Sequence, residues 1–264
     1  MNLVFKGFGI LIFLQVFANP SAFAFSFEMS GVRSNASDAN LDLFTRLNEN
    51  LDQIHSVTST ENLSQYDSIL GALKFDFIRI PISGGTVKTG VYGKYLYPNR
   101  LIQEGTSDST LNLLQKETEL SGIMGGGLLE LYTKLGAFDL GATGAIGIGP
   151  YTINQKVYNS NNAGQLDIGT ASRSEIELSS IAVEVSLGAF FRFHISKGIG
   201  VNLKGGYTRF KTTSFEASSV YGQKYENVTK GDRIYIIDNE SGESIEMQLD
   251  LSGVTYSAGL EIQL

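Results

Sequence analysis

The sixteen residues Ile181 to Ser196, "IAVEVSLGAFFRFHIS", alternate between two kinds of side chain. Every odd position from 181 to 195 is apolar, whereas the even positions include Glu184, Arg192 and His194. A period of two residues indicates a β-strand, because successive side chains of a strand point to opposite faces. We therefore predict a long strand here with one apolar face and one mixed face.

The same alternation occurs in seven further stretches, which begin near residues 25, 72, 86, 128, 138, 201 and 253. Eight strands are therefore predicted. Short connections are expected near residues 82, 135 and 196, and long ones over about 34–69, 98–116, 152–173 and 212–244. Within the first long connection, apolar residues at helical spacing predict an amphipathic helix over about 39–54.

Two architectures contain strands of this kind, a soluble β-sandwich and a transmembrane β-barrel. The predicted strands are long enough to cross a bilayer, and their number is even. Short and long connections alternate, as in outer-membrane barrels. Aromatic residues also lie near strand ends on the apolar face, as expected at membrane interfaces; these are Tyr95, Tyr97, Phe138, Phe193 and Tyr207. We therefore predict an all-β, antiparallel up-and-down transmembrane barrel of eight strands with long extracellular loops.

The first 24 residues are typical of a secretory signal peptide. Lys6 precedes the apolar run "GILIFLQVF", and the small residues Ala22 and Ala24 form an A-x-A cleavage site. The mature chain is therefore expected to span residues 25–264 as one barrel domain in the cell outer membrane. Since the sequence contains no Cys, disulfide bonds cannot hold it together.

The last strand carries a terminal pattern of a polar residue, a glycine, an apolar residue and a final aromatic or apolar residue at fixed spacing. The residues at these positions are Ser257, Gly259, Ile262 and Leu264. With this pattern, the chain resembles the superfamily of small eight-stranded bacterial outer-membrane barrels, which includes the OmpA transmembrane domain, OmpX and OmpW. It departs at Leu264, where Phe is usual. The resemblance implies that these four residues form a barrel-assembly signal. It also implies the barrel-assembly machinery, outer-membrane lipid and lipopolysaccharide as partners.

The mixed faces of the strands are expected to line a lumen that side chains fill. The predicted lumen charges are six cations and five anions: Lys74, Lys88, Lys94, Lys134, Arg192 and Lys204, with Asp76, Glu130, Asp139, Glu184 and Glu261. Because unpaired charge is costly in a water-poor interior, this near balance favours a structural charge network that plugs the lumen. A narrow porin-like channel for ions or small solutes is the alternative. No metal or cofactor is predicted.

A lipid A-modifying enzyme is the third possibility. His194 and Ser196 form a His-x-Ser pair similar to that of the deacylase PagL, and His55 resembles in position the loop His of the palmitoyltransferase PagP. A palmitoyltransferase of the PagP type needs an apolar lumen to hold an acyl chain, whereas the lumen predicted here is charged. A lumen-facing polar role for His194 and a solvated helix end for His55 are therefore preferred, and no catalytic residue is predicted.

The remaining expectations concern binding. The net charge of −7 without basic runs argues against nucleic acid. Glycine-rich stretches such as "GIMGGGL" lack the Lys-Ser/Thr ending of a phosphate-binding loop. Long acidic loops are where such a scaffold would carry recognition. We therefore expect a structural or surface-recognition barrel, without an identified extracellular ligand.

Overall fold

The computed structural model describes residues 25–36, 65–80, 85–106, 112–163, 171–222, 227–237 and 244–263. Within these ranges, the side chains of residues 76–80, 103–106, 112–114, 160–163 and 236–237 are not described. The expected signal peptide, residues 1–24, and the expected helix, residues 39–54, lie outside the described residues. No helix occurs within the described ranges.

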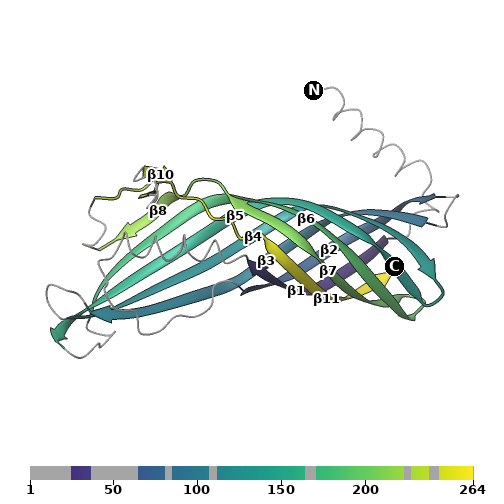
Figure 1. Ribbon diagram of the computed structural model, residues 1–264, viewed down its shortest axis with the longest axis horizontal. Coiled ribbons are helices and arrows are strands. Elements are labelled where there is room, and N and C mark those ends of the chain that lie inside the picture. The colour runs from purple at the N-terminus through teal and green to yellow at the C-terminus, as the bar shows by residue number, and fades with distance from the viewer. Residues whose placement is uncertain are drawn as a thin grey trace, which may run out of the picture.

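Eight antiparallel strands form a closed ring in the order β1-β2-β3-β4-β5-β6-β7-β11 (Figure 1). The strands are β1 Phe25–Ala36, β2 Gln65–Ile80, β3 Gly85–Thr106, β4 Asn112–Leu135, β5 Phe138–Ala163, β6 Ser172–Ser196, β7 Ile199–Thr212 and β11 Gly253–Gln263. The pairing of β11 with β1 closes the ring. Since each of the eight strands has two hydrogen-bonded neighbours, the fold is a β-barrel, and the predicted all-β antiparallel ring of eight strands is confirmed.

Tight turns define one end of the barrel, which we call the turn end. Residues 136–137 join β4 to β5, and residues 197–198 join β6 to β7. Gly136 adopts a positive φ of 67°, which glycine tolerates without the steric cost of a side chain. Short connections near 135 and 196 are thereby confirmed, while residues 81–84, around the third expected turn, lie outside the described residues.

At the opposite end, β3 to β6 continue well beyond the other strands as a curved sheet (Figure 1). We call this sheet the extension and define it as residues 96–106, 112–122, 150–163 and 172–180. Most of the expected loops 98–116 and 152–173 are therefore strand, so those two predictions are wrong. The first expected loop, 34–69, begins and ends in strand at Ala36 and Gln65.

The expected fourth loop, 212–244, also contains regular structure. β8, Glu216–Tyr221, pairs with the extended part of β6. β9, Tyr235–Ile237, pairs with β10, Ser244–Glu246. We call residues 213–222, 227–237 and 244–252 the cap. Backbone hydrogen bonds join its parts, since Phe215 N donates to Met247 O and Ile234 N donates to Phe215 O.

The apolar face changes sides where the ring passes into the extension. In β6, Ile176 and Leu178 are buried inside, but Ile181 and Val183 are exposed outside. The interior of the extension is an apolar core that the cap covers. Its buried members are Tyr66, Leu96, Leu101, Leu120, Met124, Tyr151, Ile153, Val157, Ile176, Leu178, Ala182, Phe210, Phe215, Ala217, Met247, Leu249 and Leu251. The extension therefore packs as an ordinary water-soluble sheet does, with apolar side chains inside.

Candidate functional site: the closed lumen

The outer face of the ring is apolar on all eight strands. The exposed large side chains there have 37% to 70% of their surface accessible. Representative residues, in strand order, are Phe27, Leu73, Val91, Leu129, Ile146, Leu187, Leu203 and Leu260. An apolar surface that encircles a molecule is far larger than the patches that monomeric soluble proteins expose. We call this surface the apolar belt.

The lumen inside the belt is charged, and each strand of the ring supplies one member of the same cluster. We call the cluster the charge ring. Its members, from β1 to β7 and then β11, are Glu28, Lys74, Lys88, Glu130, Asp139, Arg192, Lys204 and Glu261. Four are cations and four are anions, so the charge ring is neutral as a whole.

Lys74 lies at the centre of the charge ring with no exposed side-chain surface. Its Nζ contacts carboxylates from three other strands: Glu28, Glu130 at 2.6 Å and Glu261 at 2.9 Å. Glu28 and Glu130 are equally buried. One ammonium group therefore joins β1, β2, β4 and β11 across the lumen.

Arg192 forms the second centre. Its guanidinium contacts Glu130 at 2.8 Å, Asp139 at 3.0 Å and Glu261 at 2.7 Å. Its Nε also donates to Asn202 Oδ1 at 2.8 Å. The planar guanidinium presents five N–H donors in fixed directions, so it satisfies several acceptors at once.

Two aromatic side chains complete the surroundings of Arg192. Its guanidinium carbon lies 5.3 Å from the ring centre of Tyr132 and 5.0 Å from that of Phe190. Both rings are buried in the lumen. Cation–π attraction therefore adds to the hydrogen bonds in holding Arg192. Neither of these contacts with Arg192 was predicted from the sequence.

Lys88 and Lys204 extend the charge ring to the remaining strands. Lys88 Nζ lies 2.8 Å from Glu261 Oε1. Lys204 Nζ lies 2.8 Å from Glu28 and 3.0 Å from Glu130. Removing ions from water costs several kcal/mol each, which only close pairing and further hydrogen bonds can offset. The charge ring meets this requirement and fills the lumen with bonded side chains.

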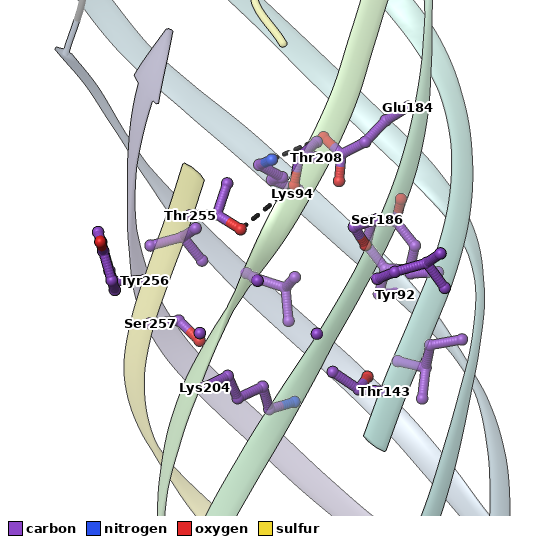
Figure 2. Close-up of a pocket in the computed structure, with 18 residues that line it drawn as sticks. Tyr92, Lys94, Thr143, Glu184, Ser186, Lys204, Thr208, Thr255, Tyr256 and Ser257 are labelled. Carbon is purple, nitrogen blue, oxygen red and sulfur yellow. Dashed lines mark hydrogen bonds and ion pairs between the residues drawn. The ribbon is translucent and has the colours of Figure 1, made fainter. Parts of the chain in front are cut away.

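A second charged pair lies nearer the extension. Lys94 Nζ approaches Glu184 Oε2 at 2.6 Å, and the two side chains are 2% and 5% exposed. Between this pair and Lys204 lies a cavity of about 90 Å³ (Figure 2). Hydroxyl groups line it, including Thr208 and Thr255, whose oxygens lie 3.3 Å apart. The lining combines these hydroxyl groups with apolar side chains, and the cavity is large enough to admit water.

Two predicted lumen charges stand apart from these contacts. Lys134 is exposed at the turn end, because it lies one residue before the end of β4 at Leu135. The side chain of Asp76 is not among the described side chains. Sequence reasoning also left Glu28 out of the lumen charges, although its position between the exposed residues Phe27 and Met29 placed it on the inner face.

His194 lies at the turn end of the lumen and is about a third exposed. Its Nε2 lies 3.0 Å from Asp139 Oδ2, and its side chain is 30% exposed. The histidine thus adjoins the charge ring through a carboxylate. Ser196, the other half of the expected His-x-Ser pair, is exposed. His55 lies outside the described residues.

The residues of the terminal pattern face both sides of β11. Ile262 is exposed on the belt, while Gly259 faces inward against β1; Leu264 lies outside the described residues. A Cβ at Gly259 would lie 2.2 Å from Ser30 Oγ and 2.4 Å from Met29 O. Close approach of β1 and β11 therefore requires glycine here, whatever its role in assembly. Ser257 lines the cavity between Lys204 and the Lys94–Glu184 pair, and it faces this cavity in Figure 2.

Two titratable groups outside the belt have pKa values shifted from the ordinary ones. In the extension, burial lowers the pKa of Lys116 to about 7. In the cap, hydrogen bonds from Thr229 lower the pKa of the exposed Asp232 carboxyl. Among the described side chains, no three His, Cys, Asp or Glu residues are grouped so that they could hold a metal ion.

Comparisons with known proteins give structural similarity but no match to a family model or to a curated sequence. Among solved structures, it is similar to Ail, the attachment invasion locus protein of Yersinia pestis, crystallised with the heparin analogue sucrose octasulfate. The match covers 92% of this chain and 97% of that one, with 9% identity and a TM-score of 0.32. Similarity at this level assigns no function. In the described part of the chain, no helix is long and apolar enough to cross a membrane.

Proposed function

We propose that the protein is an integral outer-membrane β-barrel with a closed lumen and a water-exposed recognition surface. The observation that carries the proposal is the reversal of polarity along the strands. Apolar side chains face outward around the ring, but they face inward in the extension. Lipid is the surrounding that suits the ring, and water is the surrounding that suits the extension.

The height of the belt supports a bilayer as its surroundings. In β6, the outward apolar residues run from Ile181 to Ile195. Fourteen residue steps of about 3.3 Å on a strand tilted by about 45° span roughly 33 Å. The hydrocarbon core of a bilayer is about 30 Å thick. The belt is therefore tall enough to cross it.

The outer face of the extension supports a surface role. Lys156 on β5 is paired in register with Glu117 on β4 and with Glu175 on β6. Next to this row, Arg100 forms an ion pair with Glu117. Such a charged face suits water, and exposed polar surfaces beyond a rigid barrel are common recognition sites. On this proposal the turn end faces the periplasm and the extension faces outward.

Cell fractionation and gel mobility test the membrane assignment. We expect the protein in the outer-membrane fraction, with faster migration before boiling than after it. Proteases added to intact cells should cleave within the cap and leave the ring intact. Recovery in the soluble fraction without a mobility shift would overturn the assignment.

Planar-bilayer recording tests whether the lumen is closed. The charge ring joins all eight strands through direct contacts. We therefore expect no large, steady conductance from the wild-type protein. Steady openings would favour the narrow channel over the closed barrel, while leaving the membrane assignment in place.

A further inference from the structure

The apolar belt contains a groove near the extension that is lined by residues of β3, β2, β1, β11 and β7. Its volume is about 660 Å³, which falls within the range of ligand pockets. Gly31 and Ala258 face each other across β1 and β11 and form its floor. Leu203, Tyr97 and Tyr256 stand around this floor. Figure 2 shows Tyr256 on the outside of β11.

Close packing of the strands does not explain the absence of a side chain at Gly31. A Cβ built on Gly31 meets no atom within 4 Å, in contrast to the crowded Gly259. Since the barrel could accommodate a larger residue at position 31, the missing side chain is not required by the fold. Its effect on the molecule is to keep the groove empty.

A cationic group lies at the end of the groove nearer the extension. Arg33, two residues beyond Gly31 on the same face of β1, donates from Nε and Nη2 to Asp67 at 2.8 and 2.9 Å. The two side chains are 61% and 50% exposed. Asp67 thus fixes the guanidinium at the edge of the belt through Nε and Nη2, while Nη1 has no hydrogen-bond partner among the described residues and can donate to a further acceptor.

We infer that the groove binds one acyl chain of a phosphorylated outer-leaflet lipid, whose phosphate contacts Arg33. The apolar floor suits the chain, and the guanidinium suits the phosphate. The groove also lies at the depth where the belt gives way to charged surface. An outer-leaflet lipid presents both chemical groups at this depth. The inference rests on the proposed membrane orientation, with the extension outside.

Native mass spectrometry of the folded full chain in nonionic detergent tests this inference. The probes are diphosphorylated lipid A and the same lipid without phosphates. Gly31→Leu fills the groove, and Gly93→Leu is its matched control, because a Cβ there also meets no atom within 4 Å. Arg33→Gln removes the phosphate contact. Its control is Arg100→Gln, which removes another exposed arginine that is paired with a carboxylate.

We expect Gly31→Leu to weaken lipid A binding about tenfold, equivalent to about 1.4 kcal/mol. Gly93→Leu should bind as the wild type does. Arg33→Gln should reduce the preference for the phosphorylated lipid, whereas Arg100→Gln should retain it. Equal binding by the two leucine variants would overturn the inference. If these variants still insert and shift on gels, the membrane assignment would remain, so the two failures can be distinguished.

Discussion

The ring and the extension use the same strands but bury opposite kinds of side chain. In β4, Glu130 is buried within the ring, while Leu120 is buried within the extension. On the outer face the pattern is reversed. The ring presents the apolar Leu129, which is exposed, whereas the extension presents the charged Glu119, which is partly buried. A single strand thus carries two opposite polarity patterns along its length. The comparison shows that the side-chain pattern of a strand indicates the polarity of its surroundings as well as which of its faces points inward.

Substitutions should destabilise the interiors of the ring and the extension by different mechanisms. Deleting an apolar side chain from the extension leaves a cavity. Deleting a charge from the ring leaves its buried partners ionised with one counter-charge fewer, which costs more than the pair contributed. The substitutions below test this difference in order of decreasing expected effect.

The largest effect is expected from Lys74→Met. It leaves Glu28, Glu130 and Glu261 with one cation fewer, and we expect a loss of about 3–5 kcal/mol in the free energy of unfolding. Urea unfolding in lipid vesicles, followed by circular dichroism, measures this loss. Lys134→Met is the control, because Lys134 is exposed.

A second substitution sharpens the same test. Adding Glu28→Gln to Lys74→Met restores equal numbers of cations and anions in the charge ring. We expect the double variant to regain at least about 1 kcal/mol over Lys74→Met alone. A double variant less stable than the single one would show that charge balance does not govern the ring.

Phe215→Ala probes the interior of the extension. Phe215 is fully buried and packs near Tyr151, with ring centres 6.4 Å apart. We expect a local loss of about 3 kcal/mol, seen as faster proteolysis of the cap. The gel shift of the ring should persist. Tyr221→Ala, at a side chain 66% exposed, is the control. Simultaneous loss of the gel shift would mean that the two regions unfold as one unit.

The pH dependence of the extension depends on Lys116. Burial lowers its pKa to about 7, whereas an unfolded lysine titrates near about 10.4. Between these values the unfolded state binds more protons, so the stability of the extension rises with pH. The rise is at most about 1.4 kcal/mol per pH unit. Hydrogen exchange in β4 at pH 7 and pH 9, corrected for intrinsic rates, should show slower opening at pH 9. Lys116→Met should abolish the difference.

The smallest effect is expected in the cap. Thr229 donates to Asp232 from its backbone N at 2.7 Å and its Oγ1 at 2.9 Å, and these bonds lower the Asp232 pKa. The stabilisation is therefore present above the ordinary aspartate pKa and is lost as pH falls through the lowered value. Asp232→Asn should speed exchange near residue 229 at neutral pH. Unchanged exchange would show that these bonds do not order the turn.

Sequence pattern predicted the ring well because outward-facing apolar residues and lumen-facing residues alternate along each strand. Val183 and Val185 are exposed and Glu184 is buried, as their alternation indicates. The ends of β3 to β6 were missed because the apolar positions change from even to odd along β6. Ile176 and Leu178 are even, while Ile181 is odd, so no single period covers the whole strand.

The partners within the lumen could not be predicted from the sequence. Lys94 and Glu184 meet across the lumen from β3 and β6, which are not neighbours in the ring. Alternation determines which face a residue occupies, but not which distant strand lies opposite. Barrel curvature and stagger determine that distance. The groove at Gly31 was missed for the same reason, since it depends on the packing of several strands.

The charge ring makes incorrect alignment of the strands energetically unfavourable. A slip of one residue between two strands would turn a charged side chain toward the apolar belt. A slip of two residues would carry that side chain about 6.6 Å along its strand, too far to reach its former partner. Since each of the eight strands supplies one member, an error in any strand leaves an ion unmatched. The same contacts that close the lumen thus favour correct alignment of every strand over its alternatives.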